Sequence, residues 1–65
     1  MKIIVNGEAL SSSAATLEAL LAELGKGETK VATSVNEAFV PKNLRTNHIL
    51  QDGDRVEIVA PRQGG

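Results

Sequence analysis

The residues most able to take part in a chemical reaction are the last two of the sequence, Gly64 and Gly65, where we expect a free terminal carboxylate. They lie beyond the last segment with the pattern of a strand, where neither a turn nor a helix cap needs a glycine. Two residues without side chains form the thinnest possible polypeptide, and no Cβ shields the terminal carboxylate from an approaching nucleotide. We expect this carboxylate to be the reactive group of the protein.

The chemistry open to this carboxylate depends on a partner enzyme. A carboxylate is inert toward nucleophiles in water, so the partner must first convert it into an acyl adenylate with ATP. Attack by a persulfide sulfur, followed by reduction, would leave a thiocarboxylate on Gly65. Attack by a cysteine thiol and then a lysine amine would instead make the chain a protein modifier. A non-covalent interaction module with incidental glycines is the third alternative, and the residues alone leave all three open.

Residues 61–65 predict a flexible tail that carries the carboxylate away from the folded body. Five extended residues reach roughly 17 Å. Pro61 restricts its own φ angle and biases Ala60 toward an extended conformation, which favours departure of the tail from the sheet. The residues expected to thread into a partner's active site are those before the attachment point, Arg62, Gln63 and Gly64.

The composition limits the chain to one small domain without catalytic residues of its own. A chain of 65 residues buries only about 60% of its unfolded surface, which leaves little room for an enclosed active site. The absence of cysteine excludes disulfides and thiolate metal sites. Asp52 and Asp54 flank Gly53 and indicate a turn, and His48 is interpreted as a loop residue. We therefore expect no enzyme activity, no metal and no permanently bound cofactor.

The charge pattern argues against nucleic acid and membrane partners. Seven basic and eight acidic residues give a net charge of -1, which provides no basic footprint for a phosphate backbone. Phe39 is the only aromatic residue, so successive bases would find no stacking platform. The apolar runs are too short for a signal peptide or a membrane span. We expect a cytoplasmic protein.

The first half of the chain predicts a hairpin followed by a helix. Residues 1–5 are mostly apolar, Asn6-Gly7 is a strong two-residue turn signal, and residues 8–10 can return as the partner strand. Thr16 is a candidate N-cap and Gly25 a candidate helix end, which predicts a helix over residues 16–24. Four leucines share one stripe of this helix at the spacing i, i+3, i+4 and i+7: Leu17, Leu20, Leu21 and Leu24.

The second half predicts three strands and a polar connection. The strands are expected at residues 31–35, 38–40 and 55–60, with turns at Asn36-Glu37 and Asp52-Gly53. The connection over residues 42–47 is expected to hold Leu44 inward. Lys42 and Arg45 are interpreted as solvated charges, and Phe39 as half-buried.

These elements predict an α+β fold of the β-grasp, or ubiquitin-like, kind. It has a mixed sheet of about four to five strands with one main helix packed across one face. The crossover through the helix makes the first and last strands candidates for parallel neighbours. The domain is expected to cover residues 1–60, with the tail at 61–65.

Three segments carry a resemblance to a known family. The stretch VNEAFVP at residues 35–41, the stretch ILQDGDRVEIV at 49–59 and the terminal QGG closely resemble the sulfur carrier proteins of thiazole biosynthesis in the thiamine pathway. The similarity covers nearly the whole chain. The turn at residues 36–37 departs from the family's pattern because it lacks the glycine that often follows the asparagine.

The resemblance implies a carrier that is adenylated at Gly65 by an ATP-dependent activating enzyme. Its sulfur would come from cysteine through a cysteine desulfurase or similar donor, and it would deliver this sulfur to thiazole synthase. The small subunit of molybdopterin synthase is an alternative with the same fold and tail, although it is usually longer. Chain length and the central motif favour the thiamine pathway.

Overall fold

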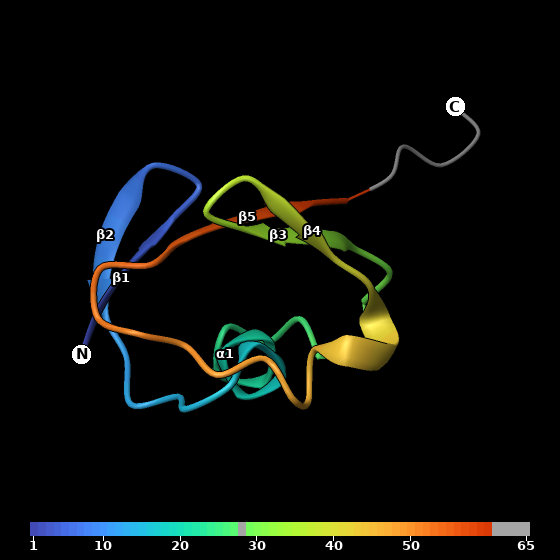
Figure 1. Cartoon of the computed structure of the whole chain (residues 1–65), viewed down its shortest axis with the longest axis horizontal. Coiled ribbons are helices and arrows are strands. Elements are labelled where there is room, and N and C mark those ends of the chain that lie inside the picture. Colours follow the sequence, from blue (N-terminus) through green and yellow to red (C-terminus); the bar gives the residue numbers. More distant parts are fainter. Residues whose placement is uncertain (28, 61–65) are drawn as a thin grey trace.

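The computed structural model describes residues 1–27 and 29–60, which form a five-stranded sheet and an α-helix. Figure 1 shows the helix α1 lying across one side of the sheet, with the long connection before the last strand passing beside it. The elements follow one another in the order β1 (Lys2–Val5), β2 (Glu8–Ser11), α1 (Leu17–Glu23), β3 (Ala32–Val35), β4 (Ala38–Val40), the 3-10 helix η1 (Lys42–Leu44) and β5 (Arg55–Val59).

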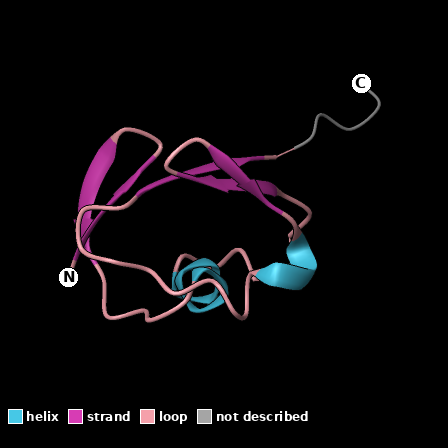
Figure 2. Ribbon diagram, viewed as in Figure 1, coloured by secondary structure: helices cyan, strands magenta, loops and turns pink. Residues whose placement is uncertain are grey.

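The sheet is mixed, and its strand order is β2-β1-β5-β3-β4. The strands form a single layer in Figure 2. The central strand β5 runs parallel to β1, and all other neighbours are antiparallel. The predicted β-grasp arrangement is confirmed, including the parallel pairing of the first and last strands.

The core lies between α1 and the inner face of the sheet. Along β5, Val56 and Ile58 are buried while the alternate residues are exposed, which is the period-two pattern of a sheet covered on one side. The buried apolar residues come from the helix, the sheet and the connections between them: Ile3, Ala14, Leu17, Leu20, Leu21, Val35, Val40, Leu50, Val56 and Ile58.

The helix α1 begins and ends close to its predicted bounds. The Thr16 hydroxyl accepts a hydrogen bond from the Ala19 amide at 3.1 Å, as an N-cap does. Gly25 follows the helix with a φ of +77°, a conformation that glycine adopts without strain. Leu17, Leu20 and Leu21 are buried, as the leucine stripe predicts.

Two side-chain predictions were wrong. Leu44, expected inward, is 50% exposed, because the side chain of Arg45 turns inward from this connection and Leu50 fills the core instead. Phe39, expected to be half-buried, is 69% exposed. It lies on the edge strand β4 opposite Ser34, and both residues belong to the sheet face that α1 does not cover.

Two asparagine side chains hold β5 from opposite sides. The chain turns at Asn6, so β1 has no backbone left to pair with Ile58. The Asn6 side-chain amide takes this role: its Nδ2 donates to the Ile58 carbonyl at 3.2 Å, and its Oδ1 accepts from the Ile58 amide at 2.9 Å. On the β3 side, Oδ1 of Asn36 accepts from the Arg55 amide at 3.0 Å. Both asparagines have a left-handed backbone, with φ angles of 50° and 51°.

Replacing Asn6 by glycine tests this role, because glycine keeps the left-handed turn but removes both side-chain hydrogen bonds. We expect Asn6→Gly to lower the free energy of unfolding by about 2 kcal/mol, since two partly buried hydrogen bonds are lost. The matched control is Asn36→Gly, whose side-chain bonds are exposed and should cost less than about 1 kcal/mol. Urea denaturation measures both, and equal losses would contradict the special role of Asn6.

The described part of the chain contains no helix that combines the length and the apolar character needed to span a bilayer.

Candidate functional site

The predicted attachment residue and the predicted threading residues lie outside the described part of the chain: Arg62, Gln63, Gly64 and Gly65. The structure does describe the strand from which they continue. This strand, β5, ends at Val59, and Ala60 is the last described residue. The site is therefore built from the end of β5 and the surfaces around it.

Strand β5 is held on both sides, by β1 near its start and by β3 along its whole length. On one side, Ile4 and Val5 of β1 pair with the first two residues of β5. On the other side, the antiparallel register with β3 continues to the last residue of β5, where Val59 lies opposite Ala32. Because β5 is the central strand, its carboxyl end holds a defined position relative to the whole domain.

An exposed apolar surface lies on the outer face of the sheet beside this end. Phe39 and Val59 are 69% and 61% exposed. The register places Phe39 opposite Ser34 and Val59 opposite Ala32, so both side chains project from the face that α1 leaves uncovered. We call Phe39, Val59 and the exposed Ala32 the outer apolar patch. It adjoins the point where the chain leaves the sheet.

The polar residues that invite a catalytic or metal-binding interpretation have structural roles. The Asp52 carboxylate accepts from the Lys2 amide at 2.7 Å, and the Asp54 carboxylate accepts from the Gln51 amide at 2.9 Å, so both stabilise the predicted turn. The His48 carbonyl accepts from the Leu17 amide at the start of α1. Within residues 1–27 and 29–60, no three histidine or acidic side chains gather as metal ligands.

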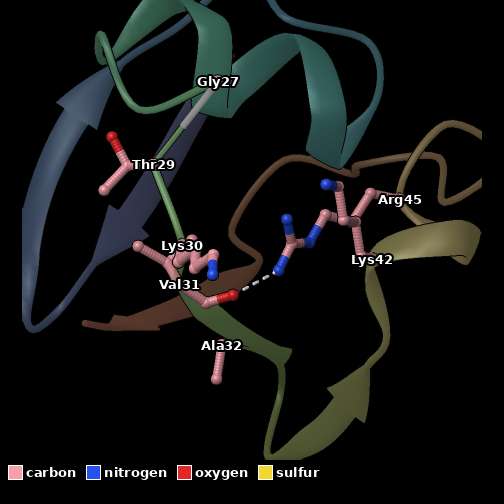
Figure 3. Close-up of a pocket in the computed structure, with 7 residues that line it drawn as sticks. All are labelled: Gly27, Thr29, Lys30, Val31, Ala32, Lys42 and Arg45. Atoms are coloured by element: carbon pink, nitrogen blue, oxygen red, sulfur yellow. Dashed lines mark hydrogen bonds between the residues drawn. The ribbon is translucent and has the colours of Figure 1, made fainter. Parts of the chain in front are cut away.

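One basic residue was placed wrongly by the sequence prediction. Arg45, interpreted as a solvated charge, is only 7% exposed, and its guanidinium binds β3. Figure 3 shows Arg45 beside a pocket at the beginning of β3, together with Lys30 and Lys42. No local pattern marks Arg45, because its acceptors lie 12 and 14 residues away in sequence.

Comparisons with known proteins agree on one family. The sequence profile described as the ThiS family matches residues 2–65. The sulfur carrier protein ThiS of Escherichia coli K12 is 32% identical over the full length of both chains. The crystal structure of the thiamine biosynthesis protein ThiS from Geobacter metallireducens superposes with a TM-score of 0.83 at 25% identity, and the match covers all of both chains.

A longer relative contains a similar segment. The thiazole synthase of Paramagnetospirillum magneticum is 47% identical over this chain, but the chain spans only 20% of that protein's length. The full-length match to a sulfur carrier, the profile match and the shared fold confirm the resemblance found in the sequence motifs. The chain therefore belongs to the ThiS family, the sulfur carriers of thiamine biosynthesis, which serve as carriers and not as catalysts.

Proposed function

We propose that the chain carries sulfur as a thiocarboxylate on Gly65 and delivers it to a thiazole synthase. The observation that carries this proposal is the diglycine itself, which begins five residues beyond a β5 strand with pairing partners on both sides. A rigid body can dock outside a partner while the terminal residues reach about 17 Å into its active site. The family match and the name of the longer relative support the same role.

Loading takes three chemical steps, and none of them uses a catalytic group of this chain. In the first, an oxygen of the Gly65 carboxylate attacks the α-phosphorus of ATP on an adenylating enzyme, and pyrophosphate leaves. In the second, a persulfide sulfur supplied by a cysteine desulfurase or similar donor attacks the acyl carbon, and AMP leaves. A reductant then cleaves the sulfur–sulfur bond, so that the thiocarboxylate remains on Gly65.

Mass spectrometry of the intact chain tests the proposal. After incubation with the adenylating enzyme, ATP and a persulfide donor, the chain should gain the mass difference between sulfur and oxygen. Omission of ATP should abolish the gain, because the carboxylate is unreactive without adenylation. Attachment of the chain to lysines of other proteins would support a protein modifier instead, and an unchanged mass would support a non-covalent module.

The receiving pathway is tested by growth. Deletion of the gene should create a requirement for thiazole, and supplying the wild-type chain should remove it. A defect in molybdenum enzymes with normal growth without thiazole would contradict the proposed recipient and favour the molybdopterin alternative.

We assign the docking of the adenylating enzyme to the outer apolar patch. Exposed aromatic side chains are costly to leave in water and are common energetic centres of protein interfaces. Phe39 is the only aromatic residue of the chain. It is 69% exposed, although the next residue, Val40, is buried in the core. Val59, on the same face of the sheet with β3 between them, is the last residue of β5. A partner that binds the outer apolar patch would therefore lie next to the point where the chain leaves the sheet.

Truncation of Phe39 tests the docking surface. We expect Phe39→Ala to raise the KM of the adenylating enzyme for the chain by about tenfold or more, since interface centres cost at least about 2 kcal/mol when truncated. The ATP-dependent step at saturating chain should keep its kcat, because Phe39 is remote in sequence from the carboxylate. The matched control is Ile49→Ala, which also removes an exposed apolar side chain, 63% accessible, but near α1. An equal effect of both variants would contradict the assignment.

A further inference from the structure

A basic pocket opens between the segment that leads from α1 into β3 and the 3-10 helix η1. Its volume is about 430 Å³, within the range of small-molecule sites. In Figure 3 the side chains of Lys30, Lys42 and Arg45 gather around it. The lining residues come from two segments of the chain, one that leads into β3 and one at η1: Gly27, Thr29, Lys30, Val31, Ala32, Lys42 and Arg45.

The guanidinium of Arg45 is held in a fixed position at this pocket. Its Nε donates to Oγ1 of Thr33 at 3.1 Å, and its Nη2 donates to the Val31 carbonyl at 2.6 Å. These bonds use two of the five N–H groups of the side chain. Nη1 has no acceptor among the residues that the structure describes, and Figure 3 shows it pointing away from β3. The guanidinium therefore keeps donors for a ligand in an orientation set by β3.

The charge of the pocket is not balanced by the described acids. A buried arginine is normally paired with an acid, because removing an unpaired charge from water is costly. Within residues 1–27 and 29–60, the structure contains one ion pair, between Arg55 and Glu37, and this exposed pair does not involve Arg45. Among the described acids, Glu18 lines a smaller cavity of about 80 Å³ together with Lys42 and Arg45, and its carboxylate accepts from the Thr46 hydroxyl.

We propose that this pocket binds the phosphate group of a small phosphorylated molecule. A planar guanidinium with free N–H groups can bind two phosphate oxygens at once, which a single ammonium cannot do. Lys30 and Lys42 are exposed and flexible enough to contact the remaining oxygens. The three cations of the pocket match the charge of a phosphate dianion better than they match the charge of a single carboxylate. The volume of the pocket also leaves room for the organic part of a phosphate ester.

The site is independent of the proposed sulfur chemistry, so it can be tested on the unmodified chain. Glycerol phosphate is the probe, and amide NMR shifts are the measurement. We expect saturable shifts at the pocket, centred on Gly27, Val31 and Arg45. Glycerol with sodium chloride at the same ionic strength should not produce them. Shifts that follow ionic strength alone would overturn the proposal.

Paired variants decide whether the lysines bind the ligand. The double variant Lys30→Gln, Lys42→Gln changes exposed residues and should fold normally. We expect its Kd for glycerol phosphate to rise by about tenfold, since hydrogen bonds to charged groups are lost. The matched control Lys2→Gln, Arg55→Gln also removes two positive charges, from β1 and β5 outside the pocket lining, and should leave the Kd unchanged. An equal effect of the control would mean general charge attraction and would overturn the site.

Two further outcomes would also overturn the proposal. Glutarate binding as tightly as glycerol phosphate at equal ionic strength would show a carboxylate site, as an acidic partner protein would use. The second concerns Glu28, which follows a lining residue in the sequence. Phosphate binding that is seen only after Glu28→Gln would show that the chain neutralises the pocket itself.

Discussion

Adding one alanine after Gly65 is expected to abolish sulfur loading, with a loss of at least about 100-fold in rate. The extra residue moves the carboxylate beyond the position at which a partner aligns it with ATP, and it places a Cβ next to the reacting carbon. A shift of about 1 Å is enough for such a loss when two groups must be aligned. The intact mass of the chain after reaction with the adenylating enzyme, ATP and a persulfide donor measures the effect.

The extended variant provides its own controls. The addition lies beyond the sheet, so the amide spectrum of residues 1–60 should match that of the wild type. Its KM for the adenylating enzyme should stay close to the wild-type value if the outer apolar patch supplies most of the docking. Sulfur loading of the extended chain at the wild-type rate, with the alanine still present in the product, would contradict Gly65 as the attachment point.

The fold was predictable because its elements are encoded by local patterns. Asn6-Gly7 specifies a two-residue hairpin, and the structure pairs β1 with β2 around it. The leucine stripe with Thr16 as N-cap specifies one amphipathic helix. Alternation along β5 specifies a strand with one buried face. Each of these signals depends on neighbours within a few residues, and the chirality of the crossover then leaves few ways to combine them.

The surfaces around the site were less predictable because they depend on contacts between distant segments. The exposure of Phe39 follows from its place on the sheet face that α1 leaves uncovered, whereas the next residue of the same edge strand, Val40, is buried. Arg45 is buried because Val31 and Thr33 offer acceptors across the domain. At the turn 36–37, the left-handed Glu37, with a φ of 73°, occupies a position where glycine is usual. The sequence predicts the diglycine chemistry directly, whereas the docking patch and the basic pocket emerge only from the fold.

The exposed Leu44 and the buried Leu20 provide the sharpest test of this packing, because both can be changed by the same substitution. Leu20 is fully buried between α1 and the sheet, whereas Leu44 is 50% exposed. We expect Leu20→Ala to lower the free energy of unfolding by about 2 to 5 kcal/mol, through lost apolar burial and the cavity left behind.

This loss is large relative to the total, because a domain of this size has a stability of roughly 3 to 10 kcal/mol. Leu20→Ala should therefore unfold a substantial part of the population at 37 °C, whereas Leu44→Ala should change the stability by less than about 1 kcal/mol. Urea denaturation followed by circular dichroism measures both variants. A comparable loss for Leu44→Ala would show that Leu44 packs inward as the sequence predicted. If the two losses differ as expected, Leu20 belongs to the core and Leu44 does not, in agreement with Arg45 being the buried residue of this connection.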